Sequence, residues 1–343
     1  MKKYSSDEHL SFDDILLIPQ HSDVKSRKDV NLGTVIGRGT KKSIGLQLPV
    51  IAAPMDTVCE WEMAAAMRKA GGLGIIHRYM SNESQAYQIS LAAAAGRVVG
   101  GSVGATGSFI SDAHNLVNAG AALILVDVAN GHSQHAIDAV KHLRNAFGHD
   151  LHIMAGNVST WDGYARLSDA GADSIRVGIG GGSACTTRVV SGHGMPTLAS
   201  IMDIRNNYKL GEGADIIADG GIRTPGDAAK ALAAGASAVM VGRMLAGTDE
   251  SPGEIVDGQK VFRGMASREA QEEGRGTVSG VEGITTKVPH TGSVHIALND
   301  FRAGLQSALS YTGVDNLIDF HTESVYNRVS SNSLHETKPH AKE

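Results

Sequence analysis

The stretch AALILVDVA, residues 121–129, is a continuous run of apolar and β-branched residues that ends in small and polar ones. A continuous apolar run is typical of a strand in a parallel sheet that is covered on both faces, whereas alternation marks a strand with one face in water. Eight runs of this character occur along the chain, at 49–54, 72–77, 96–105, 121–129, 151–158, 173–180, 214–221 and 237–244.

The spacing of these runs predicts how they are connected. Their ends lie roughly 20 to 40 residues apart, which is the length of one strand, one helix and two loops. Segments rich in alanine and other helix formers, ending at or next to glycine, occur at 62–71, 84–96, 136–148, 225–236 and 295–313. Eight such units predict an α/β protein with a closed (β/α)8 barrel, a TIM barrel. An open doubly wound sheet is the alternative, because a sequence pattern does not show closure.

The composition agrees with one barrel domain over residues 1–343. The chain has 42 glycines and only 4% aromatic residues, which indicates many tight turns and excludes a helical bundle. No second compact domain, such as a CBS insertion, fits between the strands. Residues 248–292 are rich in charge and glycine and are predicted to be a mobile active-site loop after strand eight, and 330–343 a polar C-terminal tail.

Charge and cysteine content limit the partners. A net charge of −5 gives no basic face for nucleic acid or an anionic membrane surface. Two cysteines cannot form a disulfide framework, and neither a signal peptide nor an 18-residue apolar run is present, so a cytoplasmic protein is expected. The 15 histidines lack ligand spacing, so no transition metal is expected.

The loop GIGGGSAC, residues 178–185, places Cys185 directly after the sixth predicted strand. Catalytic groups of such barrels lie on the loops that follow the strands. A thiol there is a nucleophile if its thiolate is stabilised, and a small buried apolar residue is the alternative. The glycines and the following Thr186, Thr187 and Arg188 favour the nucleophile.

Strands seven and eight end in ADGGIRTPGD (218–227) and MVGRMLAG (240–247), where many barrels bind phosphate. Asp219 would then accept hydrogen bonds from a ribose diol. The alternative is that these glycines only turn the chain. Asp127 ends strand four, and its residue type alone fits a ligand contact and a helix cap equally well.

With these segments assembled, the sequence resembles the IMP dehydrogenase and GMP reductase family, whose fold is a (β/α)8 barrel. The matching motifs run almost from end to end, and their combination and order are specific. They are SFDDILLIPQHSDVKSR, MDTV, GLGIIHR, DVANGHSQH, MAGNV, VGIGGGSACTTR, IIADGGIRTPGD, GRMLAGTDESPGE, FRGMAS, VEGITTKVP and LQSALSYTG.

The resemblance implies that Cys185 attacks C2 of a purine 5′-monophosphate, giving a thioimidate whose chemistry is coupled to hydride transfer with a nicotinamide. It assigns proton transfer to Thr187 and Glu282, although a plain loop glutamate is the alternative for Glu282. It also implies a homotetramer and a potassium ion bound by the loop of Gly180, Gly182, Cys185 and Arg188.

The resemblance further carries over two sets of ligand contacts. Nucleotide contacts are implied for Ser183, Asp219, Gly220, Gly221, Gly242, Arg243, Gly264, Met265 and Glu282. Cofactor contacts are implied for Ser26, Arg27, Arg78, Asp127, Val128, Ala129, Ile179, Gly180, Ser307 and Ser310.

Two features favour the reductase branch. The segment REAQEEGRGTVSG, residues 268–280, is short and lacks the Arg-Tyr pair that activates water in the dehydrogenases. No CBS pair separates strands two and three. Lys25, Arg27 and Arg78 supply charge for the extra phosphate of NADPH, which is therefore preferred over NADH. The prediction is an NADPH-dependent GMP reductase that forms IMP and ammonia.

Other features keep alternatives open. Pro54 in APMDTV and the terminal SLHETKPH resemble the dehydrogenases, so an IMP dehydrogenase without CBS domains is one alternative. Gly181, His193, Arg243 and Ala266 depart from the family pattern, and a reductase of a modified purine nucleotide is another. A nucleotide-binding barrel without turnover is the third.

Overall fold

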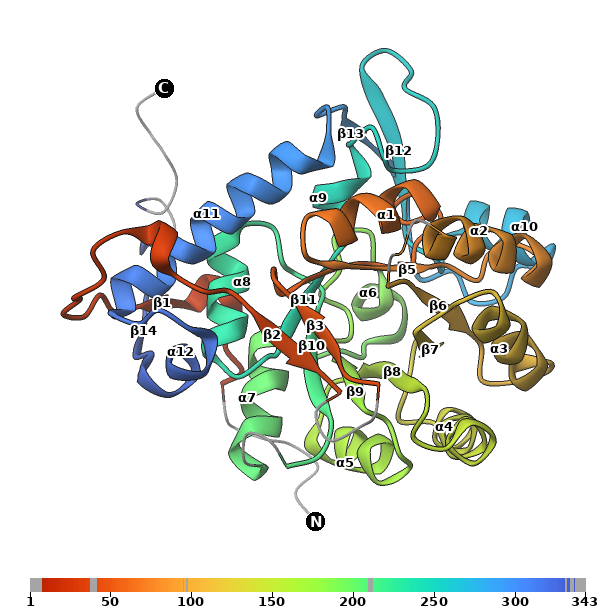
Figure 1. The fold of residues 1–343 in the computed structure, drawn as a ribbon, viewed down its shortest axis with the longest axis horizontal. Coiled ribbons are helices and arrows are strands. Elements are labelled where there is room, and N and C mark those ends of the chain that lie inside the picture. Colours follow the sequence, from red (N-terminus) through yellow and green to blue (C-terminus); the bar gives the residue numbers. More distant parts are fainter. Residues whose placement is uncertain are drawn as a thin grey trace.

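The computed structural model describes residues 8–37, 42–94, 96, 98–208, 212–330, 332, 333 and 336. Eight parallel strands close into a barrel, in which the last strand pairs with the first (Figure 1). The eight predicted strands are confirmed, and the open sheet is excluded. They are β4 (Val50–Ala52), β5 (Leu73–Ile76), β6 (Gly100–Val103), β7 (Leu123–Asp127), β8 (His152–Val158), β9 (Ser174–Val177), β10 (Asp215–Asp219) and β11 (Ala238–Val241).

Helices surround the barrel, and the five predicted ones are confirmed as α1 (Trp61–Lys69), α2 (Asn82–Ala94), α4 (Gln134–Phe147), α8 (Pro225–Ala233) and α11 (Val294–Thr312). Three more, α3 (Phe109–Asn118), α5 (Trp161–Asp169) and α7 (Thr197–Asn207), were not predicted. In α5, glycine and aspartate lower the intrinsic helix propensity, but the Thr160 cap and the burial of Tyr164 and Leu167 stabilise the helix. Within the described ranges, no helix has both the length and the apolar character needed to cross a bilayer.

The continuous apolar strands have a direct physical cause, which β7 illustrates. Leu123 and Leu125 belong to the cluster inside the barrel, while Ile124 and Val126 belong to the larger cluster between the barrel and the helices. All four side chains are fully buried. Because both faces of the strand are covered, neither face tolerates the polar residues that an exposed face would carry.

Short elements close the two ends of the barrel. The hairpin of β2 (Thr34–Ile36) and β3 (Ile44–Leu46) packs Ile36, Ile44 and Leu46 against the residues inside the barrel. The remaining elements are η1 (Phe12–Asp14), β1 (Ile15–Leu17), η2 (Arg27–Asp29), α6 (Thr187–Ser191), α9 (Arg243–Ala246), β12 (Gln259–Arg263), α10 (Arg268–Arg275), β13 (Thr285–Pro289), α12 (Leu317–Glu323) and β14 (Tyr326–Arg328).

Residues 248–292 are more regular than a loop. They contain the antiparallel pair β12 and β13, which projects from the barrel in Figure 1, and helix α10. Side chains in β12 alternate between buried and exposed, and Lys260 and Phe262 are the buried ones. A strand needs apolar contact on only one face, so β12 forms although the segment has few apolar residues. The mobility of this segment stays a prediction. Of the predicted tail, residues 331, 334, 335 and 337–343 lie outside the described residues.

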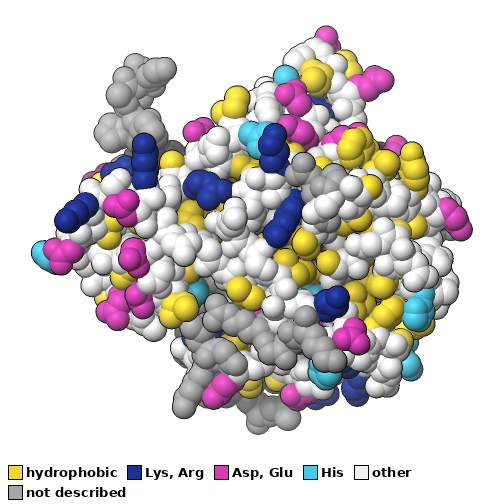
Figure 2. Space-filling view, in the orientation of Figure 1, with side chains coloured by type: hydrophobic (Ala, Val, Ile, Leu, Met, Phe, Trp, Pro, Cys, Tyr) yellow, Lys and Arg dark blue, Asp and Glu magenta, His cyan; other side chains and the backbone are white. Residues whose placement is uncertain are grey.

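The surface seen in Figure 2 carries acidic and basic side chains mixed together.

A cluster of buried polar residues lies at the end of the barrel where the strands begin. His152 is fully buried, its Nε2 lies 2.8 Å from Ser174 Oγ, and burial lowers the pKa of the imidazole to about 4. Asp215 nearby accepts hydrogen bonds from the Gly37 amide at 2.7 Å and from Ser237 Oγ at 2.6 Å. The native structure therefore holds His152 neutral.

This burial predicts a pH dependence of stability. An unfolded histidine takes up a proton near pH 6.5, whereas native His152 does so only near pH 4, so the folded state loses stability as pH falls between these values. The loss reaches about 3 kcal/mol, at about 1.4 kcal/mol per pH unit. Urea unfolding at pH 7.5 and 5 should show a smaller difference for His152→Gln than for the wild type. Exposed His149→Gln is the control, and an unchanged difference in His152→Gln would contradict the assignment.

Candidate active site

A cavity of about 1130 Å³ lies at the carboxyl ends of the barrel strands, where enzymes of this architecture have their active sites. Its volume exceeds the upper end of the range for one drug-sized ligand, so it has room for two ligands. Most of the predicted site residues line it, namely Arg78, Asp127, Val128, Ala129, Ile179, Gly180, Gly182, Ser183, Cys185, Thr187, Arg188, Asp219, Gly220, Gly221, Gly242, Arg243, Gly264, Met265 and Glu282.

Four predicted cofactor residues lie elsewhere. Ser26 and Arg27 are at η2, and Ser307 and Ser310 are in α11, which packs against it. The Arg27 guanidinium lies 5.7 Å from the centre of the Tyr311 ring. None of the four lines the cavity of this chain, so the structure does not bring them together with the other predicted residues.

Cys185 begins a chain of hydrogen bonds. Its thiol lies in the partly exposed loop before α6 and donates to Thr187 Oγ1 at 3.2 Å. The Thr187 hydroxyl in turn donates to Glu282 Oε2 at 2.7 Å. These three groups form one path along which a proton can move between sulfur and carboxylate. Cys185 is therefore not a buried apolar residue, and Glu282 is hydrogen-bonded to the loop that carries the thiol, while the catalytic roles of both residues stay predictions.

The other cysteine shows the contrast. Cys59 is fully buried, and burial raises the pKa of its thiol well above the usual range. A thiol in such surroundings stays protonated and unreactive. Cys59 therefore packs as a small apolar residue, and Cys185 is the candidate nucleophile.

Backbone pairing fixes the position of Glu282 relative to Cys185. The Thr186 amide donates to the Glu282 carbonyl at 2.9 Å, and the Ile284 amide donates to the Ala184 carbonyl at 3.0 Å. A side chain at Gly283 would place its Cβ only 2.9 Å from the Ser267 amide nitrogen, so glycine permits this approach. The segment after β12 thus forms a wall beside the thiol.

An ion-pair cluster anchors this wall to the barrel. Arg263, at the end of β12, donates to Asp56 Oδ2 at 2.9 and 2.6 Å and to Glu273 Oε2 at 2.6 Å. The hydrogen bond to Glu273 and the nearby Asp56 carboxylate raise the pKa of Arg263 despite partial burial. Asp56 follows β4 and Glu273 lies in α10, so one guanidinium joins three segments.

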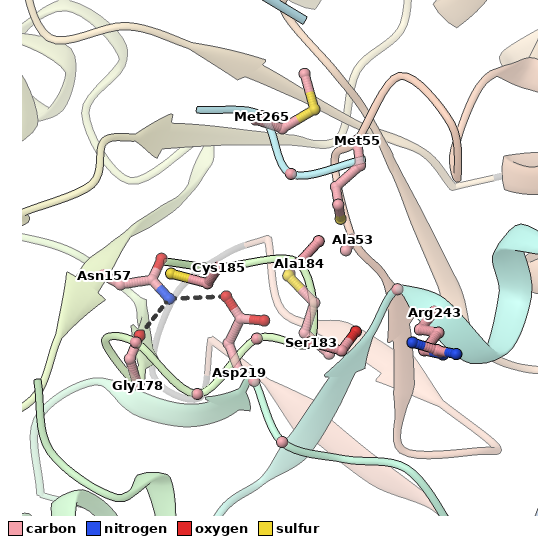
Figure 3. Close-up of a pocket in the computed structure, with 18 of the residues that line it drawn as sticks. Ala53, Met55, Asn157, Gly178, Ser183, Ala184, Cys185, Asp219, Arg243 and Met265 are labelled. Carbon is pink, nitrogen blue, oxygen red and sulfur yellow. Dashed lines mark hydrogen bonds between the residues drawn. The ribbon is translucent and has the colours of Figure 1, made fainter. Parts of the chain in front are cut away.

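A second buried arginine organises the acidic side of the cavity. Arg176, in β9, donates to Asp127 Oδ1 at 2.5 Å and to Asp219 Oδ2 at 2.8 Å. Burial alone would lower the pKa of Arg176, but the two carboxylates outweigh it and hold the pKa above its usual value. Asn157 Nδ2 also donates to Asp219 Oδ2, at 2.7 Å (Figure 3). Asp219 Oδ1 accepts from no residue in the described ranges, and it is available to a ligand.

This network answers the question left open at Asp127. Its carboxylate pairs with Arg176, and helix α4 is capped by Ser133, so the helix-cap alternative is wrong. Sequence reasoning missed Arg176 and Asn157. Both lie in strands made mostly of apolar and small residues. A polar residue in a buried strand needs a polar partner, and this could have indicated both residues from the sequence.

One glycine sets how closely two strand ends approach. Gly178 follows β9 with φ +140°, and a Cβ there would lie 2.0 Å from the Asp219 carbonyl oxygen. No other residue type fits this position. The close approach brings the cysteine loop beside the end of β10.

The described residues contain no group of three or more His, Cys, Asp or Glu side chains arranged to hold a metal ion. Two orphaned polar atoms do lie at the cavity. Arg78 Nε has no hydrogen-bond acceptor, with the Asp127 carboxylate 3.8 Å away, and the buried Thr197 hydroxyl beside the cysteine loop is unpartnered. Ligands or water could satisfy both.

Comparison with known proteins gives a consistent result. The family model described as "IMP dehydrogenase / GMP reductase domain" matches residues 9–340. An inosine-5′-monophosphate dehydrogenase of Cryptosporidium parvum is 35% identical over 388 residues, covering 96% of this chain and 94% of that protein. A GMP reductase of Leishmania major is 31% identical over 481 residues, covering 97% of each. A GMP reductase variant from Trypanosoma brucei, solved with guanosine 5′-monophosphate, superposes with a TM-score of 0.92 at 28% identity, covering 99% of both chains.

These relatives carry both names at comparable identity. The reductase of Leishmania major aligns over 481 residues and the dehydrogenase of Cryptosporidium parvum over only 388, so the longer relative here is the reductase. Chain length therefore does not separate the two activities. The absence of an insertion between β5 and β6 therefore no longer favours the reductase over the dehydrogenase.

The Arg176 network predicts a large cost for its loss. Arg176→Gln leaves the partly buried Asp219 carboxylate without a counter-charge and Asp127 with only Arg78, 3.8 Å away, so we expect the free energy of unfolding to fall by about 3 kcal/mol. Arg166→Gln is the matched control, because Arg166 forms an exposed i,i+4 pair with Asp162 that is worth about 0.5 kcal/mol or less. Urea unfolding measures both. Equal losses in the two variants would show that the buried pairs do not stabilise the fold.

Proposed function

Because this chain belongs to the family of IMP dehydrogenases and GMP reductases, oxidoreductases that act on purine nucleotides, we propose that it is a GMP reductase. It would convert GMP to IMP and ammonia, with NADPH as the hydride donor. The observation that carries the proposal is the wall around Cys185. Among its described residues, from 264 to 284, Glu282 is the one ionisable side chain that lines the cavity.

A dehydrogenase must hydrolyse its thioimidate, and hydrolysis needs a base that activates water. The dehydrogenases implied by the resemblance use an Arg-Tyr pair for this. Residues 268–280 contain no tyrosine, and they form α10 and the loop after it. Glu282 is already the acceptor of the Thr187 hydroxyl. This arrangement suits protonation of a departing amine better than activation of water.

The hydrogen-bond path supports the first half of the reaction. The proton of the Cys185 thiol can pass through Thr187 to Glu282, which leaves a thiolate to attack C2 of GMP. The same path can return that proton to the 2-amino group. As the C2–S bond forms, the C2–N bond breaks and ammonia leaves, so a thioimidate remains on Cys185.

The second half requires a nicotinamide cofactor, and the residues present fit one. Arg78, Tyr79 and residues 127–129 line the cavity, and the orphaned Arg78 Nε suits an anionic group. When bound, reduced nicotinamide supplies the hydride that replaces sulfur at C2 and regenerates the thiolate. The choice of NADPH over NADH rests on Arg78 and on the charges of Lys25 and Arg27.

The nucleotide would bind at the ends of β10 and β11. Asp219 Oδ1 can accept from a ribose hydroxyl, and the glycines after β10 and β11 allow a phosphate to approach the backbone. Ser26, Arg27, Ser307 and Ser310 lie away from this cavity, so they would contact a cofactor only from a neighbouring subunit. That placement supports the proposed homotetramer, whereas a cytoplasmic location stays a prediction.

An IMP dehydrogenase without CBS domains is the second candidate. The relatives that carry this name at comparable identity favour it, as does Pro54 at the cavity. A reductase of a modified purine nucleotide would use the same thiol path. To distinguish the GMP reductase from the IMP dehydrogenase, the protein is incubated with GMP and NADPH in one assay and with IMP and NAD⁺ in another. A screen of modified purine nucleotides tests the remaining candidate.

The thiol path gives a mutational prediction. With saturating GMP and NADPH, Glu282→Gln and Thr187→Val should lower kcat roughly 10²- to 10⁴-fold, because they remove the proton path without removing the thiol. Cys185→Ala should abolish turnover. Ammonia release and the loss of NADPH absorbance measure the rate.

Cys59→Ala is the matched control for Cys185→Ala, because Cys59 is buried outside the cavity. It should keep kcat. If Cys185→Ala kept the wild-type kcat, the thiol would have no role in the mechanism. If the protein formed NADH from IMP and did not turn over GMP, it would be a dehydrogenase and not a reductase.

The potassium site has a separate test. Backbone carbonyls of Gly180, Gly182 and Cys185 are hard oxygen ligands, which suit an alkali cation, and they lie on the loop that holds the thiol. Replacing KCl by LiCl at constant ionic strength should lower kcat, because the smaller ion cannot satisfy the same loop. Equal rates in both salts would contradict the potassium site.

A further inference from the structure

Glu282 lies in the middle of three short backbone segments. Two backbone hydrogen bonds join its segment to the cysteine loop on one side. On the other side, the Glu282 amide donates to the Ala266 carbonyl at 3.0 Å. The Gly264 amide donates to the Ile284 carbonyl at 3.1 Å. The position of the Glu282 carboxylate therefore depends on how residues 264–266 are held.

The sheet of the barrel does not hold these residues. Among the described strands, β12 pairs with β13 alone, in a two-stranded sheet that is separate from the barrel. The last pair of this ladder joins Arg263 to Thr285, and residues 264–266 follow directly. Arg263 is thus the attachment point nearest to the segment that borders Glu282.

Arg263 is tied to the residues after β4 at several points. Its Nε and Nη2 donate to the same oxygen of Asp56, Oδ2, at 2.9 and 2.6 Å, and its amide donates to Thr57 Oγ1 at 3.3 Å. The Asp56 amide lies 3.4 Å from the sulfur of Met265. Met265 and Met55 lie on the same side of the cavity in Figure 3. The Arg263 side chain thus tethers the wall to a strand of the barrel.

The two ion pairs of Arg263 differ in exposure. The Arg263 and Asp56 side chains are 12% and 11% exposed, and in the described part of the chain Asp56 pairs with no other basic group. The Glu273 side chain is 67% exposed. An exposed pair contributes little, whereas a desolvated pair holds its partners firmly because breaking it leaves a buried charge. The Asp56 pair is therefore the one that can fix the wall.

The tether lies outside the cavity, but its effect reaches the proton path. Neither Asp56 nor Arg263 lines the cavity, so neither takes a direct part in the chemistry. Glu282 does line it and accepts from the Thr187 hydroxyl at 2.7 Å. A shift of about 1 Å would break a hydrogen bond of this length. A loosened wall would therefore interrupt the proton path and leave the thiol in place.

We propose that Arg263 is a positioning residue, whose ion pair with Asp56 keeps Glu282 in place at the end of the proton path. The inference deepens the proposed function, because it rests on proton transfer through Glu282. It assigns no contact between Arg263 and the substrate or the cofactor.

A double-mutant cycle on kcat tests the proposal. With saturating GMP and NADPH, Arg263→Met should lower kcat roughly 10- to 100-fold, the cost of misplacing a catalytic group by about 1 Å. In the Glu282→Gln background the same substitution should lower kcat by less than about threefold, because residues that act through one another are not additive. Equal losses in both backgrounds would overturn the positioning role, since general damage to the fold acts regardless of Glu282.

Three further variants separate the tether from the charges. Arg263→Met combined with Asp56→Asn leaves no unpaired carboxylate and should keep the low kcat of Arg263→Met. Recovery of the wild-type kcat would overturn the proposal, because a stranded charge would then explain the loss. Arg263→Lys keeps the charge and one donor, so it should regain part of kcat. Glu273→Gln should stay within about twofold of the wild type, because its pair is exposed.

Arg144→Met is the matched control. Arg144 pairs with Asp173 at 2.6 Å, and its side chain is 13% exposed. This pair lies outside the cavity, at the end of the barrel where β9 begins. The variant should unfold more easily than the wild type and keep its kcat. A loss of kcat as large as that of Arg263→Met would overturn the specific role of Arg263.

Hydrogen exchange follows the wall without turnover. In Arg263→Met, the amides of Glu282 and Ile284 should exchange faster than in the wild type, and those of the barrel strands should not change. Unchanged exchange at Glu282 would overturn the positioning by Arg263, even in a protein that reduces GMP. Faster exchange in Arg263→Met, when the wild type reduces no GMP, would overturn the proposed function and leave the tether in place.

Discussion

Closure of the parallel barrel is the constraint on which the rest of the structure depends. Pairing of β11 with β4 brings the ends of the strands into one ring, so side chains from Arg78 to Glu282 meet around a single cavity. Asp127 ends β7, and the pairing of β7 with β8, of β8 with β9 and of β9 with β10 brings it within reach of Arg176 and Asp219. The chemistry of the site is therefore a consequence of the topology, and each loop needs only to supply the right side chain at its own strand end.

Within that ring, charge is distributed in two ways. Arg176, which is buried, and Arg263, which is partly buried, are matched by carboxylates, and they hold strand ends and the wall of the cavity in place. Among the described residues, the Arg243 guanidinium has no hydrogen-bond or ion-pair partner, and neither has one oxygen of Asp219. Matched charges build the frame because an unpaired buried charge is costly, while unmatched charges at the cavity surface are the ones that ligands can use.

The sequence predicts the barrel well because a strand covered on both faces must be apolar throughout, and this pattern needs no long-range information. It also predicts much of the lining of the cavity, since the glycine-rich strand ends at Cys185 and Gly242 both border it. It does not predict α5 or the β12 and β13 pair, which tertiary packing stabilises against weak local preferences. It also does not predict the ion pairs of Arg176 or those that join Asp56, Arg263 and Glu273. These pairs include residues that are far apart in the chain. The resemblance to known families supplied the role of Glu282, which spacing alone leaves open.

In the proposed reaction, the Cys185 sulfur displaces ammonia from C2 of GMP before any hydride is transferred. The most direct measurement incubates the protein with GMP in the absence of NADPH, then records ammonia release and the mass of the Cys185 peptide after acid quenching. We expect at most one ammonia per thiol and a mass gain equal to GMP minus ammonia on that peptide. An adduct that forms from IMP with NAD⁺ but not from GMP would contradict it.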